Sequence, residues 1–154
     1  MIIWLTGQPG SGKSTLANTL IEKIKKIELS NKIINIDGDD LRFINMNQDY
    51  SKEGRIKNIS TAISIARFLS NKEYTVVISI VAPYRFLRDE LKEQFTFLEV
   101  YLFTDEVRGR EDFFAKDYEI PIDKKTLFID TGKKNIEECT SEIFNVYRKM
   151  ATVA

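Results

Sequence analysis

The chain has 154 residues, of which 23 are basic, 23 are acidic and none is histidine. Its length suits one globular domain that buries about two-thirds of its surface, and its balanced charge argues against nucleic acid held by a general positive field. The single cysteine, Cys139, excludes an internal disulfide and the absence of histidine excludes the usual zinc sites, so any proton acceptor must be a carboxylate.

Five short apolar runs alternate with longer segments of helical period, which indicates repeated βαβ units and a parallel sheet covered on both faces. The runs span residues 2–6, 32–36, 75–80, 97–103 and 126–129. Helices are predicted over residues 14–26 and 51–71, where apolar side chains recur every three or four positions. A last helix is predicted from Asn135, a capping residue, and Cys139 lies on its apolar stripe, where we expect core packing.

No internal repeat or flexible linker interrupts the chain, so we expect a single domain over residues 1–154. The polar stretch 107–125 has the least regular pattern and is a candidate mobile lid. The first residues run directly into an apolar strand without a basic leader. We therefore expect a cytoplasmic protein that has no membrane partner.

Residues 7–14 match a phosphate-binding loop, and they follow a predicted strand and open a predicted helix, which makes the match specific. The predicted ATP-binding residues here are Gly7, Gln8, Pro9, Gly10, Ser11, Gly12, Lys13, Ser14 and Thr15. Lys13 is expected to reach the β- and γ-phosphates, and the Ser14 hydroxyl is expected to ligate Mg²⁺. The sequence therefore predicts an α/β fold of the P-loop NTPase type, a three-layer α/β/α arrangement with a five-stranded parallel sheet, that binds ATP with Mg²⁺.

Carboxylates and an arginine follow the second predicted strand, at the edge where open α/β sheets bind ligands. Asp37 and Asp39 can accept a proton from an attacking hydroxyl or hold Mg²⁺, and Arg42 can pair with an anionic acceptor. Farther along the chain, Arg55 and Asn58 lie three residues apart, so they share one helix face and can converge on one ligand. Beside a phosphate loop, Asp37, Asp39 and Arg42 favour a site over a solvated turn, whereas Arg55 and Asn58 taken alone suit a solvated helix start.

In this order, the motifs resemble those of the adenylylsulfate kinases over nearly the whole chain. The matching segments are 3–14, 37–42, Ser51 with Arg55 and 58–59, 79–84 with Arg88, 117–121, 127–131 and the helix from Asn135. The resemblance implies an ATP-dependent kinase that phosphorylates the ribose 3′-hydroxyl of adenylylsulfate and releases ADP.

The resemblance also implies roles for individual residues of this sequence. It makes Asp39 the base or a metal-linked carboxylate, with Asp37 assisting and sharing Mg²⁺ with Ser14, and it places Arg110 at the start of the lid, against the triphosphate. The implied acceptor-binding residues are Arg42, Tyr50, Arg55, Asn58, Ala82, Pro83, Tyr84 and Phe114. Among these, the Tyr50 ring is implied to stack on the base of the acceptor, with Phe114 as the opposing ring.

Three departures from the family pattern bear on the acceptor. Ala82 stands where the family usually has serine, which excludes a phosphoryl-enzyme at that position and favours direct in-line transfer. The segment between Arg110 and Asp117 is shorter and less basic than the lid of the family, and Ser60 and Thr61 replace paired arginines. These changes weaken the expected recognition of a sulfate-bearing anhydride.

Adenylylsulfate is therefore the first expected acceptor among several alternatives. A cytidine diphosphoramidate kinase would act on the same ribose hydroxyl, and the reduced lid suits its acceptor somewhat better. A polynucleotide or modified-nucleotide kinase is a further alternative, against which the balanced charge and the short chain argue. A non-catalytic ATP-binding module is the alternative from another class, and a homodimer is left open.

Overall fold

The computed structural model describes residues 1–153, in which five parallel strands form one sheet. The strands are β1 (Ile2–Thr6), β2 (Ile33–Asp37), β3 (Thr75–Ser79), β4 (Phe97–Phe103) and β5 (Leu127–Asp130). They lie in the order β2-β3-β1-β4-β5, and every neighbouring pair is parallel. The predicted parallel sheet and its five strands are confirmed.

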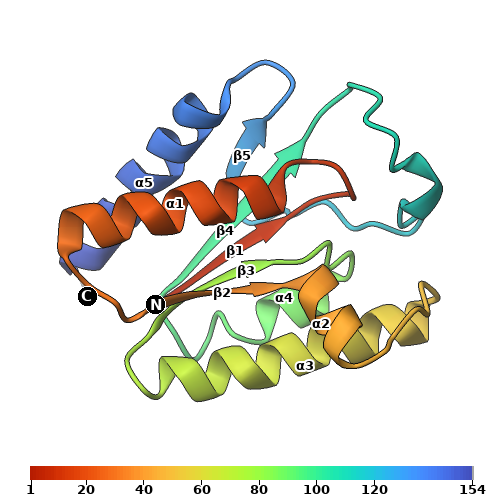
Figure 1. Cartoon of the computed structure of the whole chain (residues 1–154), viewed down its shortest axis with the longest axis horizontal. Helices are drawn as coiled ribbons and strands as arrows, with labels where there is room; N and C mark the ends of the chain where they lie inside the picture. Colours follow the sequence, from red (N-terminus) through yellow and green to blue (C-terminus); the bar gives the residue numbers. More distant parts are fainter. Residues whose placement is uncertain (154) are drawn as a thin grey trace.

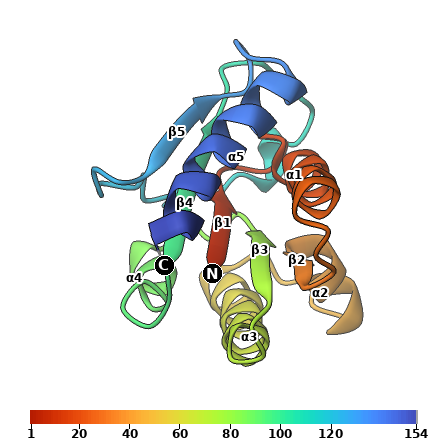
Figure 2. The ribbon, with the colours of Figure 1, turned by 90° about the vertical axis from the view of Figure 1, so that its left-hand side faces the viewer.

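Helices cover both faces of this sheet (Figure 1, Figure 2). One face carries α1 (Lys13–Glu28) and α5 (Ile136–Val153). The other face carries α2 (Gly38–Ile44), α3 (Lys52–Ser70) and α4 (Arg85–Asp89). The predicted three-layer α/β/α arrangement is therefore confirmed.

The central strand, β1, supplies side chains to both halves of the core. Ile3 and Leu5 pack with the residues of α1 and α5, whereas Ile2 and Trp4 pack with those of α3. All five residues of β1 are buried, because a parallel sheet with helices on both faces leaves its middle strand no solvated side. The strand thus reads as a continuous apolar run, and its carboxyl end delivers the chain to the phosphate loop.

The ends of the helices follow capping chemistry that is visible in the sequence. The Asn135 side chain accepts a hydrogen bond from Glu138 N, and the Glu138 carboxylate accepts one from Asn135 N, both at 2.9 Å. Cys139, in the first turn of α5, is buried in the core as expected. The short helices α2 and α4 lack a predictable period, because seven and five residues span too few turns to show one.

The segment between β4 and β5 extends beyond the carboxyl ends of the strands (Figure 1). Its regular structure is one short 3₁₀ turn, η1 (Glu111–Phe113), in line with the irregular pattern of residues 107–125. A search of residues 1–153 finds no helix with the length and apolar character needed to cross a membrane.

A buried ion pair joins α4 to β4. The Arg88 guanidinium is fully buried, and its Nε donates to Glu99 Oε1 at 2.8 Å. Its two terminal nitrogens donate to the backbone oxygens of Ala82 and Glu119, each at 2.6 Å. Lys92 Nζ donates to the second carboxylate oxygen of Glu99 at 2.8 Å. Arg88 therefore ties the loop after β3 to the end of the lid segment.

Removing the charge of Glu99 should destabilise the fold strongly. Glu99→Gln leaves the buried Arg88 without its counter-charge, so we expect the free energy of unfolding to fall by about 3 kcal/mol or more. Urea unfolding followed by the fluorescence of Trp4, which is buried and is the only tryptophan of the chain, measures this loss. The control Glu90→Gln breaks a partly exposed pair with Arg67 and should cost under about 1 kcal/mol. Equal losses in the two variants would contradict this account.

Candidate active site

The phosphate loop connects the carboxyl end of β1 to α1, and glycine is required where it turns. A Cβ on Gly7 would lie 2.2 Å from the carbonyl oxygen of Leu102 in the neighbouring strand, which no side chain tolerates. Gly12 has a φ of 100° and caps α1, a conformation that favours glycine. The free N–H groups of the first helical turn thereby face the loop and form an anion-binding end.

Lys13 is buried at the centre of the loop. Its ammonium donates to the backbone oxygens of Gly7 at 3.0 Å and Gln8 at 2.8 Å. Burial lowers the pKa of Lys13 to about 8, although the nearby carboxylates of Asp39 and Asp37 act in the opposite direction. Phosphate oxygens beside this ammonium would replace its lost hydration and stabilise its charge.

Asp37 joins the loop to the neighbouring strands. Its Oδ2 accepts hydrogen bonds from the hydroxyls of Ser14 at 2.5 Å and Ser79 at 2.9 Å. Its Oδ1 accepts one from Asp39 N at 2.9 Å, so the same carboxylate caps α2. The predicted pair Ser14 and Asp37 is thus brought into direct contact at the carboxyl edge of the sheet.

Two polar side chains from α2 and α3 form part of the opposite wall. Arg42 Nη1 donates to the backbone oxygen of Asp49 at 2.8 Å, which folds the chain between the two helices around the guanidinium. Asn58 Nδ2 donates to the backbone oxygen of Gly38 at 3.3 Å. The other amide atom, Asn58 Oδ1, is buried without a partner among the described residues. It is an acceptor that a hydroxyl or amino group of a ligand could satisfy.

The aromatic part of this wall differs from the expectation. The Tyr50 ring lines the cavity and lies 5.2 Å from the ring of Phe113, whereas neither Phe113 nor Phe114, the expected opposing ring, lines the cavity itself. The Arg42 guanidinium covers the Tyr50 ring at 4.1 Å. Arg55 donates to the backbone oxygens of Tyr50 at 3.0 Å and Phe113 at 2.8 Å, and so holds the two aromatic segments together.

The loop after β3 lines the cavity with Ala82 and Pro83 but not with the side chain of Tyr84. Ala82 and Pro83 line the cavity as expected, and Ala82 is fully buried with a left-handed φ of 43°. Tyr84 does not line the cavity. It is 3% exposed and belongs to the core cluster that contains Leu87 and Leu91, at the N-terminal end of α4.

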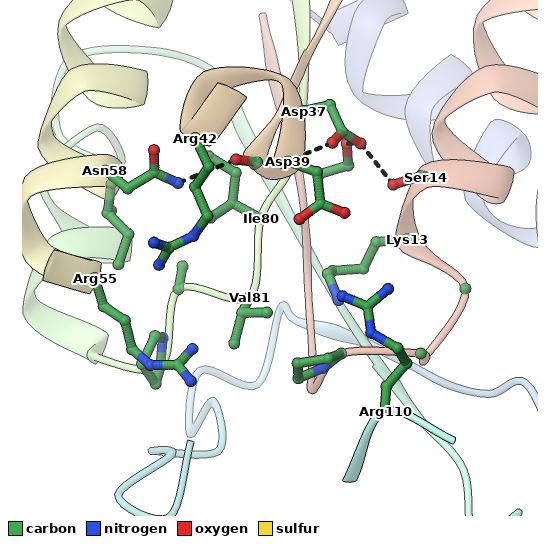
Figure 3. Close-up of a pocket in the computed structure, with 18 of the residues that line it drawn as sticks. Lys13, Ser14, Asp37, Asp39, Arg42, Arg55, Asn58, Ile80, Val81 and Arg110 are labelled. Carbon is green, nitrogen blue, oxygen red and sulfur yellow. Dashed lines mark hydrogen bonds between the residues drawn. The ribbon is translucent and has the colours of Figure 1, made fainter. Parts of the chain in front are cut away.

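These groups surround a cavity of about 380 Å³ (Figure 3). Lys13 and Arg110 point into it from the phosphate loop and the lid, Asp39 points toward Lys13 from α2, and Arg42 and Arg55 enter from the other side. The other predicted residues that line it are Pro9, Gly10, Gly12, Ser14, Thr15, Asp37, Tyr50, Asn58, Ala82 and Pro83. The predicted residues outside its lining are Gly7, Gln8, Ser11, Tyr84 and Phe114.

Arg108 is a residue of the site that the sequence did not single out. Its guanidinium donates to the backbone oxygens of Gly10 at 3.1 Å and Thr131 at 3.0 Å, so it bridges the phosphate loop and the end of β5. Arg108 lines the main cavity and also a second hollow of about 270 Å³, which Thr15 and Lys134 border on the outer side of the loop. The only feature of the sequence that could have indicated Arg108 is its position two residues before Arg110, the predicted lid arginine.

Comparisons with known proteins agree with this geometry. The family model of adenylylsulphate kinase matches residues 1–116. An adenylyl-sulfate kinase from Prochlorococcus marinus is 32% identical over 94% of this chain and 82% of that protein. A cytidine diphosphoramidate kinase from Campylobacter jejuni is 34% identical over 68% of this chain and 61% of that protein. The solved structure of the Mycobacterium tuberculosis APS kinase in complex with AMPPNP and APS has a TM-score of 0.80 at 20% identity, covering 96% of both chains.

The matched region contains the loop, the carboxylates and the acceptor wall described above. Residues 1–116 include Lys13, Asp37, Asp39 and Arg55, and they make up more than half of the chain. The similar solved structure supports the same fold throughout. The chain therefore belongs to the adenylylsulphate kinase family, and it is an ATP-dependent phosphotransferase with an alcohol group as acceptor.

Proposed function

We propose that this protein transfers the γ-phosphoryl group of ATP to the ribose 3′-hydroxyl of a small nucleotide with a substituted 5′-phosphate, adenylylsulfate first. The observation that carries the proposal is the facing arrangement in one cavity. Lys13 and Asp39 point into it from one side, and Arg55 lines the opposite wall. A donor phosphate and an acceptor hydroxyl can thus approach each other between the two walls.

The donor side suits ATP with Mg²⁺. Ser14 and Asp37 present hard oxygen ligands 2.5 Å apart beside the loop, which is the chemistry that Mg²⁺ prefers. Residues 1–153 contain no group of three acidic, histidine or cysteine side chains that could hold a metal alone, so the phosphates and water would complete its shell. Bound Mg²⁺ would neutralise charge on the β- and γ-phosphates, as Lys13 does. The hollow beside Thr15 and Arg108 is the proposed place for the adenine of ATP.

On the acceptor side, Asp39 is proposed to accept the proton of the attacking hydroxyl. It is exposed at the mouth of the cavity and near enough to Lys13 to influence its pKa. Arg55 and the free amide oxygen of Asn58 would hold the acceptor. Alanine at position 82 has no nucleophile, so transfer would pass directly from ATP to the hydroxyl.

A cytidine diphosphoramidate is the second candidate acceptor, and the state of the arginines favours it. Arg42 and Arg55 already donate to backbone oxygens, so they offer fewer free N–H donors to a sulfate. Glu111 and Asp112 add negative charge next to Arg108 and Arg110, which line the cavity. An anhydride that ends in a neutral amide would meet less repulsion there.

Acceptor-dependent turnover tests the proposed function. The purified protein with Mg-ATP should form ADP when adenylylsulfate or cytidine diphosphoramidate is added, and ³¹P NMR should place the new phosphate on the ribose 3′-oxygen. The acceptor with the higher kcat/KM identifies the substrate. The proposal would be refuted if neither nucleotide increased the formation of ADP, or if the new phosphate were at another position.

Asparagine at position 39 should abolish transfer while ATP still binds. Because Asp39→Asn cannot accept the proton of the hydroxyl, we expect kcat to fall by about 10²-fold or more. The control is Asp40→Asn, which changes the exposed neighbour that does not line the cavity and should keep normal turnover. Normal turnover by Asp39→Asn would move the role of base to another carboxylate.

The affinity for ATP should fall at alkaline pH because of Lys13. Its pKa is about 8 in the free protein, and bound phosphates would raise it, so binding takes up a proton above pH 8. The association constant should therefore fall by up to about tenfold per pH unit above that value. Titration calorimetry in two buffers of different ionisation enthalpy measures the uptake. Lys13→Met should bind ATP more weakly and without this proton uptake. Equal proton uptake by both proteins would count against Lys13 as the group that takes up the proton.

A further inference from the structure

The Gln8 side chain pairs with the backbone of the lid rather than with the cavity. Gln8 Nε2 donates to the backbone oxygen of Ala115 at 2.8 Å, and Ala115 N donates to Gln8 Oε1 at 2.9 Å. One side chain thus satisfies both backbone groups of a residue in a segment without regular structure. Ala115 is 4% exposed, whereas its neighbour Phe114 is 40% exposed. The pair therefore fixes a buried point within an otherwise exposed segment.

This contact is the middle one of three that join residues 108–118, here called the strap, to residues 6–10. Tyr118 lies at its far end, with its hydroxyl 2.6 Å from Thr6 Oγ1. Since Thr6 Oγ1 donates to Val81 O, Tyr118 is the donor of that bond. At the near end, Arg108 donates to Gly10 O. Alternate residues 6, 8 and 10 thus hold residues 118, 115 and 108, so the strap runs antiparallel to the start of the phosphate loop.

The strap also supports two residues that line the acceptor wall, Arg55 and Tyr50. Phe113 lies two residues before Ala115, and its backbone oxygen accepts the bond from Arg55 at 2.8 Å. The Phe113 ring lies 5.2 Å from the Tyr50 ring. A shift of Ala115 would therefore move the Phe113 ring beside Tyr50 and the Phe113 oxygen that binds Arg55. The ammonium of Lys13 would be less affected, because it donates to backbone oxygens of the phosphate loop itself.

We propose that Gln8 is a positioning residue for the acceptor: by holding Ala115 through two hydrogen bonds, it fixes Phe113, whose backbone oxygen holds Arg55 in the acceptor wall. Glutamine has the required chemistry, because its amide offers a donor and an acceptor side by side, whereas a glutamate carboxylate only accepts. The inference rests on the proposed function in that the acceptor binds against this wall. It assigns to a residue of the phosphate loop a role in acceptor recognition.

Gln8→Met tests the proposal, because methionine has a similar length and makes neither bond. Hydrogen exchange followed by mass spectrometry should show faster exchange in peptides from residues 108–118 and unchanged exchange in residues 136–153. The KM for the nucleotide acceptor should rise roughly tenfold, the effect of two lost hydrogen bonds, and more than the KM for ATP. The control Gln94→Met removes bonds to Arg67 and to the backbone of Glu90, outside the cavity, and should change neither measurement.

Gln8→Glu gives a readout that a merely structural role would not produce. The ionised carboxylate can accept from Ala115 N but faces Ala115 O with no proton, whereas the protonated acid restores both bonds. The KM of this variant for the acceptor, divided by that of the unaltered protein at the same pH, should therefore fall as the pH is lowered. The division removes the effects of pH on ATP and on Asp39.

Unchanged exchange of the strap in Gln8→Met would overturn the proposal. Equal increases in the KM for ATP and the KM for the acceptor would also overturn it, as would a pH-independent ratio for Gln8→Glu. Failure of the proposed function looks different, because the unaltered protein would then turn over neither nucleotide. In that case the hydrogen-exchange measurement on Gln8→Met still decides whether Gln8 holds the strap, because that measurement needs no acceptor.

Discussion

The site depends on one carboxylate, Asp37, which sits at the end of β2 and accepts hydrogen bonds from three different segments. Ser14 reaches it from the phosphate loop, Ser79 from the next strand and Asp39 N from the first turn of α2. Because all three donors converge on two oxygen atoms, the donor side and the acceptor side of the cavity share a fixed reference point. Catalytic groups from distant parts of the chain can then keep their mutual distances.

Much of this architecture could be predicted from the sequence, and the exceptions have physical causes. Strands and long helices carry a period that survives in a single sequence, and the phosphate loop has a dense motif. The strap has no period, so the choice between Phe113 and Phe114 as the ring beside Tyr50 could not be made from the sequence. Gln8 belongs to the motif, but its direction depends on the unpaired backbone groups of Ala115, more than one hundred residues away.

The acceptor wall is already organised without a ligand. Arg42 and Arg55 donate to backbone oxygens of the segments that they orient, so their side chains are held in place before an acceptor arrives. Such preorganisation lowers the entropy lost on binding, but it also divides each guanidinium between protein and ligand. Tyr50 illustrates the same compromise, because Arg42 covers one part of its ring and Phe113 faces another. In the proposed function, recognition of the acceptor would depend on shape as well as on charge.

The antiparallel hold on the strap has a consequence for how related chains can differ in length. Its first two contacts are at Arg108 and Ala115, and the backbone between them includes Gly109, which has a φ of 78° and no atom near its open side. Residues added at Gly109, before the turn that carries Phe113, would leave both contacts and the bond from Arg55 to Phe113 O in place, since exposed turns tolerate changes of length at small entropic cost. A change of length between Ala115 and Tyr118 would instead displace one of their contacts, with Gln8 or with Thr6. The strap can therefore accept extra length at Gly109 more easily than near Tyr118.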